Sequence, residues 1–131
     1  IYLPHHLCTR EFFELVDSRL LSDGVVALNL GGITRDDPVV AAVTATVASV
    51  FDRVEMARVP FTRNWIVLAW KGAPPTDVAR RSRLEQTPCL AELEWMVDGS
   101  HFAPVVAGGG TLLHDGRAAV GSLAHDAWQQ P

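Results

Sequence analysis

The sequence predicts an α/β fold, and three observations lead to this prediction. A helical pattern precedes a short apolar run, VVALNL, and a second helical pattern separates that run from a more polar one. A third run, NWIVLAW, follows after a turn of only a few residues. Short runs that are apolar at consecutive positions are typical of strands covered on both faces. Strands joined by so few residues pair antiparallel, so the expected order is helix, strand, helix, strand, strand.

The first helix is expected over residues 10–21. Thr9 is in place to cap its N-terminus, because a threonine hydroxyl accepts a hydrogen bond from a free backbone N–H of the first turn. The apolar residues recur at helical spacing and define one buried face, which consists of Phe12, Leu15, Val16 and Leu20. The turn at Asp23-Gly24 ends the helix, with the glycine expected in the left-handed conformation.

Residues 25–30, VVALNL, form the first predicted strand, and Gly31-Gly32 closes it. The next helix begins at Asp37-Pro38, because aspartate is a good N-cap and proline is tolerated in the first helical position. This helix is expected to run to about residue 51. Its buried stripe is predicted to consist of Val39, Val43, Val47 and Val50.

The remaining strands are predicted over residues 54–59 and 64–70. Glu55 and Arg58 make the former more polar, which suits an edge position, whereas NWIVLAW is apolar throughout and is expected in the centre. The run VVALNL then becomes the other edge. An uncovered apolar edge invites pairing, so we expect it to be covered by a missing N-terminal half, a second subunit or a separate chain.

The C-terminal part is predicted to be mainly helical. A charged helix begins at Thr76, and a second begins at Thr87-Pro88, with apolar residues in register at Leu90, Leu93 and Val97. Residues 100–113 are expected to be irregular, and residues 117–129 to form a weak last helix. We therefore expect a single incomplete domain, in which residues 1–72 form the main α/β part and residues 73–131 form a helical C-terminal extension.

Composition and charge exclude several classes of protein. The chain has 131 residues, 48% hydrophobic residues and a formal net charge of −4. Such a composition argues against disorder and against nucleic-acid binding as the main task. No signal peptide is visible, and the stretch over residues 39–51 is too short to span a bilayer. We expect a soluble, cytoplasmic protein with no membrane partner.

The two cysteines, Cys8 and Cys89, lie far apart in the sequence and form neither a disulfide framework nor a zinc pattern. We expect two buried free thiols. His5, His6 and Cys8 include metal-ligand types, but no second cluster completes a four-coordinate site, so no metal is predicted.

The chain begins IYLPHHLCTREFFELV and continues with LLSDGVVALNLGG, then VASVFDRV, then VPFTRNWIVLAW. These four segments, in this order, resemble the C-terminal half of the spermidine synthase-like proteins. Members of that family carry a Tyr-x-Pro-x-His-Leu-x-Thr-x-Glu-Phe-Phe stretch, an Asp-Gly-Val strand ending in Asn, a helix ending in Val-Phe and an Asn-aromatic-Ile-Val strand. The tail LLHDGRAAVGSL is similar more loosely, and it departs from the family pattern at His114, Gly116, Ala119 and Gly121.

The resemblance implies a methyltransferase-type Rossmann-like fold in which these strands are the fifth, sixth and seventh. It further implies aminopropyl transfer from decarboxylated S-adenosylmethionine to a polyamine acceptor, or alternatively methyl transfer from S-adenosylmethionine. The donor-binding loop and the catalytic Asp of that family would lie upstream of Ile1. We therefore expect no catalytic residue and no bound cofactor in this chain, and we expect it to be inactive alone.

Four residues are candidates for substrate binding. By resemblance, Tyr2 lies in the loop after the expected catalytic Asp, and His6 matches the family histidine. Asn29 ends the first strand, and ligands bind outside the carboxyl ends of strands in α/β sheets. Asn64 begins the last strand, and antiparallel pairing brings it near Asn29. Trp65 is assigned to the core.

Other charged groups have simpler structural interpretations. Asp36 and Asp37 form either a paired-carboxylate site or, as we favour, a helix cap. His114 and Asp115 suggest acid/base chemistry but show no third partner in the sequence. The cluster of Arg80, Arg81 and Arg83 is interpreted as a solvated helix face.

A function from another class stays open. The chain is alternatively a non-catalytic module that dimerises or binds a partner through the exposed edge of VVALNL. The expected partners are thus a small polyamine substrate and either a second copy of the chain or the missing N-terminal half.

Overall fold

A computed structural model describes residues 4–89, 101–106, 108 and 110–116. It is a mixed α/β structure built on a four-stranded sheet. The elements in chain order are a short 3₁₀ helix η1 (His5–Leu7), α1 (Arg10–Arg19), β1 (Val25–Gly31), α2 (Pro38–Ala48), β2 (Arg53–Arg58), β3 (Asn64–Trp70), α3 (Asp77–Glu85) and β4 (Ala103–Pro104). The predicted helix with Leu90, Leu93 and Val97 and the predicted last helix lie outside the described residues.

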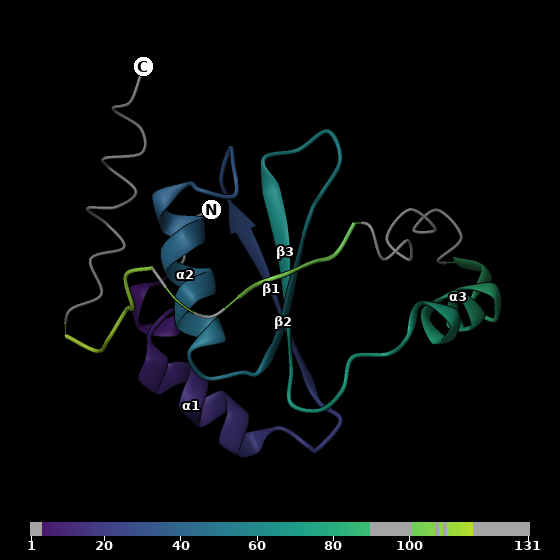
Figure 1. Ribbon diagram of the computed structural model, residues 1–131, viewed down its shortest axis with the longest axis horizontal. Helices are drawn as coiled ribbons and strands as arrows, with labels where there is room; N and C mark the ends of the chain where they lie inside the picture. The colour runs from purple at the N-terminus through teal and green to yellow at the C-terminus, as the bar shows by residue number, and fades with distance from the viewer. Residues whose placement is uncertain (1–3, 90–100, 107, 109, 117–131) are drawn as a thin grey trace.

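The strands lie in the order β1-β3-β2-β4, and every neighbouring pair is antiparallel. The predicted central position of residues 64–70 is therefore confirmed. Since β1 and β2 are both antiparallel to β3, they run parallel to each other on its two sides (Figure 1). Within the described residues β1 pairs with β3 alone, so it forms one edge of the sheet, as expected.

The predicted edge position of residues 54–59 is wrong for part of the strand. The segment expected to be irregular supplies β4, whose Ala103 pairs with Met56 and whose Pro104 pairs with Glu55. The prediction took the polarity of Glu55 as a sign of an edge strand. The Glu55 carboxylate instead pairs with the Arg80 guanidinium, so it does not need an open edge of the sheet.

The prediction that VVALNL is covered on both faces is also wrong. Exposure alternates along β1, with Val25, Ala27 and Asn29 exposed and Leu30 fully buried. Only the face that carries Leu30 packs into the core, where Val40 of α2 belongs to the same cluster. This alternation is the pattern of a half-covered strand in an antiparallel sheet.

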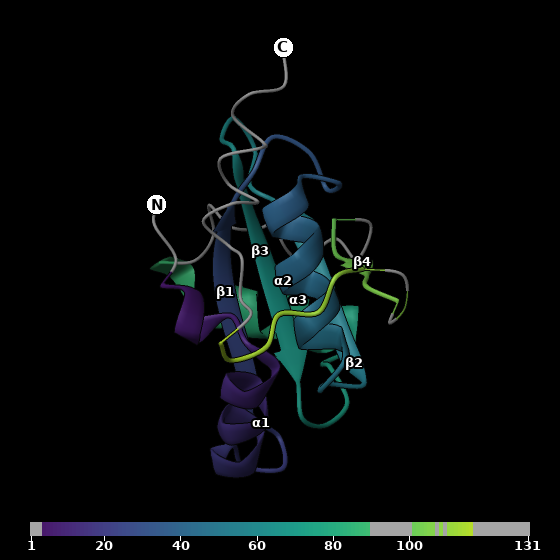
Figure 2. The same cartoon turned by 90° about the vertical axis from the view of Figure 1, so that its left-hand side faces the viewer.

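The helices form two layers on opposite sides of the sheet. Helices α1 and α2 lie on one side and α3 lies on the other, as two perpendicular views show (Figures 1 and 2). The predicted caps at Thr9 and Asp37 are confirmed, because each side chain accepts a hydrogen bond from a backbone N–H of the helix that follows. Thr76, where a helix was predicted to begin, caps α3 in the same way. Each cap satisfies a donor that has no partner within its own helix.

The predicted buried face of the first helix is confirmed except at Leu15. Phe12, Val16 and Leu20 pack against the core cluster. Leu15 is 56% exposed, and Phe13, which lies outside the predicted face, is fully buried. The buried arc is centred on Phe13 and Val16, which lie one turn apart on the helix. Gly24 also differs from the prediction, because it has no positive φ. A Cβ on it would instead lie 2.9 Å from Cδ2 of Leu20.

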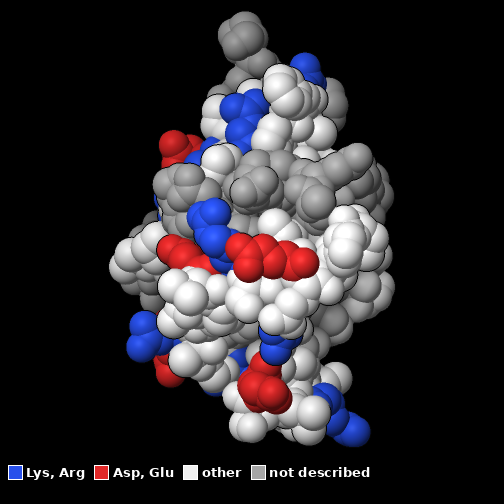
Figure 3. Space-filling model, turned by 90° about the vertical axis from the view of Figure 1, so that its right-hand side faces the viewer, with Lys and Arg blue, Asp and Glu red and all other residues white. Residues whose placement is uncertain are grey.

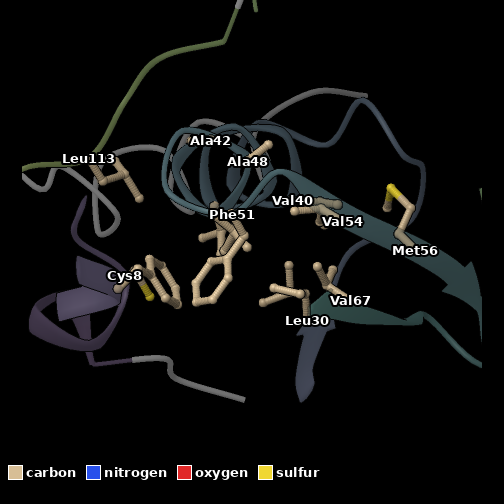
Figure 4. Close-up of a cluster of buried hydrophobic side chains, with 14 residues drawn as sticks. Cys8, Leu30, Val40, Ala42, Ala48, Phe51, Val54, Met56, Val67 and Leu113 are labelled. Atoms are coloured by element: carbon tan, nitrogen blue, oxygen red, sulfur yellow. The ribbon is translucent and has the colours of Figure 1, made fainter. Parts of the chain in front are cut away.

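The main hydrophobic cluster lies between α2 and the sheet. Strand residues Leu30, Val54, Met56 and Val67 face Val40 and the other buried side chains of α2 (Figure 4). Val43 and Val47 of the predicted valine stripe are buried, whereas Val39 and Val50 are half-buried. The helix also buries residues that the stripe did not include, namely Val40, Ala42, Thr44, Thr46 and Ala48. Among the described residues, no helix is both long enough and apolar enough to cross a membrane.

Residues 110–113 cover the side of α2 that faces away from the sheet. A Cβ on Gly110 would lie 2.6 Å from Cβ of Ala45, so the backbone approaches the helix closely at this glycine. The Leu113 N–H donates to Oγ1 of Thr46 at 3.0 Å, and the Leu113 carbonyl accepts from the Arg10 N–H at 2.8 Å. This segment therefore joins α1 to α2 in the core.

Candidate functional site

The two predicted asparagines lie on the same face of the sheet. Asn29 opposes Ile66 in the β1·β3 ladder and Asn64 opposes Gly31, so the two residues are diagonal neighbours across the strands. Diagonal neighbours are typically about 7–8 Å apart between their Cα atoms. Asn29 is exposed and Asn64 is partly exposed. The predicted proximity of the two residues is confirmed, and their face is the one opposite Leu30 and α2.

The structure places only one of the two candidate residues near the N-terminus, Tyr2 and His6. Tyr2 lies outside the described residues. His6 is exposed on η1, where its ring makes an edge contact with the ring of His5, with centroids 5.6 Å apart. No hydrogen bond from the His6 side chain is present in the described part of the chain. His6 is thus available to solvent.

The paired aspartates have a structural explanation. Oδ1 of Asp37 accepts from the Val39 N–H at 3.2 Å, which is the predicted cap of α2. Asp36 is exposed. No cluster of three or more metal-ligand side chains occurs among the described residues.

His114 has a third partner that was not visible in the sequence. Its Nδ1 lies 2.8 Å from Oε1 of Glu11, in the first turn of α1, and Oε2 of Glu11 accepts from the Asp115 N–H at 3.0 Å. The hydrogen bond with His114 is the main reason that the pKa of Glu11 falls to about 2. Both oxygens of this carboxylate are therefore used to tie residues 114 and 115 to α1.

The two cysteines differ from each other. Cys8 is fully buried, and desolvation raises the pKa of its thiol to about 11. The prediction of a buried free thiol is confirmed for Cys8 and wrong for Cys89, which is exposed. Cys89 comes just after α3, on the side of the sheet away from the main cluster.

The arginines of α3 are not simply a solvated face. Arg80 pairs with Glu55 at 2.7 Å, and both side chains are largely buried, with 13% and 20% of their surface exposed. The Arg80 guanidinium also lies 5.9 Å from the ring centroid of Trp70 and 5.3 Å from that of Phe102. This contact joins α3 to β2 and β3, on a face where acidic and basic side chains lie beside one another (Figure 3).

A pocket of about 390 Å³ lies on the α2 side of the sheet, beyond the carboxyl ends of β1 and β2. Met56 and Trp65 contribute its apolar wall, and Arg35 and Arg58 bring two guanidinium groups to it. The other lining residues are Pro60, His101 and Ala103. Arg58 and Trp65 are direct partners in the β2·β3 ladder and so lie on the same face.

The sequence interpretation missed this pocket. Trp65, which was assigned to the core, packs against the hydrophobic cluster and also lines the pocket. A signal was nevertheless present. Arg35 follows the first predicted strand and Arg58 ends the second, so the rule that placed ligands at the carboxyl ends of strands applied to both. This signal was overlooked because a single arginine in a sequence is usually exposed to solvent.

Comparison with family models, curated proteins and solved structures gives no match for this chain.

Proposed function

We propose that this chain is the C-terminal part of a spermidine synthase-like transferase that uses an S-adenosyl donor. The observation that carries the proposal is the strand order. A central strand, β3, lies antiparallel between two strands that are parallel to each other, which is the arrangement that the sequence resemblance implies for the end of that fold. The segments that carry the resemblance are the ones that form this arrangement.

The edge of β1 supports the second part of the proposal, that further strands complete the sheet. Within the described residues its backbone groups pair on the β3 side only. An unpaired strand edge exposes N–H and C=O groups that pair readily with another strand. In the proposed enzyme the donor-binding half supplies that strand together with the base that deprotonates the amine.

In this proposal Asn29 and Asn64 belong to the acceptor side. Their amide groups offer both hydrogen-bond acceptors and donors on one accessible face, and acceptors suit the ammonium groups of a polyamine. Aminopropyl transfer needs the amine held against the carbon next to the donor sulfonium, and a base to take the proton. In this proposal the residues of this chain help to position the amine, and the base belongs to the donor-binding half.

The test compares this chain with a longer polypeptide that includes the coding sequence preceding Ile1. Each is titrated with methylthioadenosine by calorimetry and assayed with putrescine and decarboxylated S-adenosylmethionine. We expect transfer only from the longer polypeptide, which should also bind methylthioadenosine more tightly than this chain does. Transfer by this chain alone, equal affinity of the two polypeptides for methylthioadenosine, or an upstream sequence that encodes no donor-binding half, would refute the proposal. Methylation of the acceptor by S-adenosylmethionine would assign the alternative chemistry.

A second candidate function follows from the same edge. A chain that pairs β1 with β1 of a second copy would be a dimerising module without catalysis. Sedimentation of the purified chain distinguishes the two, since a dimer that dissociates when Ala27 is changed to proline favours the module. Proline removes a backbone donor and is poorly tolerated in a paired strand.

A further inference from the structure

The pocket between Arg35, Arg58 and Trp65 has no role in the proposed transfer. It lies on the α2 side of the sheet, whereas Asn29 and Asn64 lie on the opposite face. Two guanidinium groups would also repel a polyamine. The pocket therefore calls for a ligand of a different chemistry.

The walls of the pocket are held in place by contacts between distant parts of the chain. The Trp65 Nε1–H donates to the Gly32 carbonyl at 3.2 Å, so the indole is tied to the loop that follows β1. Nη2 of Arg35, from the same loop, donates to the Pro104 carbonyl of β4 at 3.0 Å. Met56 lines the pocket, is 2% exposed and pairs with Ala103, which also lines the pocket. The cavity is thus formed before any ligand binds.

The positive charges of Arg35 and Arg58, which line the pocket, are not compensated by an ion pair in the described part of the chain. The Arg58 side chain makes no ion pair or hydrogen bond there, and the Arg35 guanidinium donates to a neutral carbonyl. No carboxylate lines the cavity among the described residues. Two like charges near one another lower stability, and here they occur in a chain of net charge −4. An anion bound by both arginines would remove the repulsion between them.

The shape and chemistry together define the ligand class. Guanidinium groups bind phosphate and carboxylate oxygens through two parallel hydrogen bonds, and paired arginines suit the greater charge of a phosphate. An indole beside a thioether offers a surface against which a planar ring packs. The volume is in the range that accommodates a small organic molecule.

From this geometry we propose that the pocket binds a phosphate monoester that carries a planar ring, of the nucleoside monophosphate class. The phosphate contacts Arg35 and Arg58, and the ring packs on Trp65 and Met56. The site is separate from the proposed acceptor side, so its occupancy does not depend on the proposed transferase activity.

The experiment titrates this chain with adenosine monophosphate, adenosine and inorganic phosphate, and follows calorimetric heat and the Trp65 indole N–H resonance. We expect saturable binding of adenosine monophosphate, with a shift of that resonance. Loss of the charge-assisted hydrogen bonds predicts about tenfold weaker binding of adenosine. Inorganic phosphate is also expected to bind more weakly, because it lacks the ring.

Arg58→Gln tests the assignment, and Arg53→Gln is its matched control. Both arginines are exposed on β2 and lose the same charge, but Arg53 opposes Trp70 on the other face. We expect Arg58→Gln to weaken binding about tenfold with an unchanged melting temperature, and Arg53→Gln to bind like the parent chain. Arg58→Lys retains the charge without the planar fork and should bind with intermediate affinity.

Three results would overturn the proposal. The first is no saturable binding of adenosine monophosphate. The second is equal affinity for this nucleotide and for either adenosine or inorganic phosphate. The third is equal loss of affinity in Arg58→Gln and Arg53→Gln, which would indicate a general effect of charge.

Discussion

Replacing Thr46 by valine tests how residues 110–113 are held against α2. Oγ1 of Thr46 donates to the Ala42 carbonyl at 2.7 Å and accepts from the Leu113 N–H at 3.0 Å. Thr46 is fully buried and Leu113 is 1% exposed. Valine has nearly the same shape as threonine but accepts no hydrogen bond, so Thr46→Val leaves the Leu113 N–H buried without a partner.

The expected loss follows from the cost of an unsatisfied buried donor, which is about 1–3 kcal/mol. For a chain of this length, 1 kcal/mol corresponds to a change of roughly 4 °C in melting temperature. Thr46→Val should therefore lower the melting temperature by roughly 4–12 °C.

Thr44→Val is the matched control on the same helix. Thr44 is 6% exposed, and its Oγ1 donates to the Val40 carbonyl at 2.7 Å and to the Ala41 carbonyl at 3.1 Å. Carbonyls within a helix already accept bonds from the helix backbone, so no buried group loses its sole partner. We expect a smaller loss than in Thr46→Val, of about 0.5–1 kcal/mol, because only the net contribution of a hydrogen bond is lost and no buried donor is left without a partner.

Urea unfolding followed by the fluorescence of the four tryptophans measures both variants. Hydrogen exchange at the Leu113 amide adds a local measurement, because this amide should exchange faster in Thr46→Val than in the parent chain. Equal destabilisation by the two substitutions would refute the reasoning, since the hydrogen bond to Leu113 is what distinguishes them.

Three further predictions concern reactivity, pH and packing. Ellman's reagent should label Cys89 quickly and Cys8 only on unfolding, because burial raises the Cys8 pKa to about 11; two fast thiols would contradict this. The folded-state pKa of Glu11 lies below its ordinary value of 4.5, so its contribution to stability is present above 4.5 and is lost as the pH falls towards about 2. Glu11→Gln should make the melting temperature less dependent on pH between about 2 and 4.5. A pH dependence equal to that of the parent chain would contradict this role of Glu11. Gly32→Ala should cost about 1–3 kcal/mol, because the new Cβ would lie 2.4 Å from Cγ2 of Val40, whereas Gly31→Ala meets no atom within 4 Å; equal melting temperatures would exclude this packing.

Local patterns predicted much of the fold. The caps at Thr9, Asp37 and Thr76 depend on contacts within one helical turn, so the identities of neighbouring residues suffice to place them. The central position of β3 followed from its apolar run. The burial of Phe13 instead of Leu15 in α1 did not follow in the same way, because the two residues are equally apolar and only the position of the core decides between them.

For the candidate site, too, some contacts followed from the sequence and others did not. The proximity of Asn29 and Asn64 followed from antiparallel pairing, which needs only the strand order. The role of Arg80 did not follow, because its partner Glu55 is 25 positions away and lies on a different element. A charged residue on a helix resembles a solvated one until the strand beneath it is known.

The sequence by itself determined the three helices and three longer strands, where those helices begin and which strand is central, because these properties depend on near neighbours and on the period of the apolar residues. It did not predict β4, which forms only by pairing with β2. The tertiary structure alone decided that Glu11 bonds to His114, that Thr46 bonds to Leu113 and that Arg35 and Arg58 line one pocket with Trp65. These contacts join residues far apart in the chain. Their geometry is set by strand register and helix placement, which no local pattern specifies.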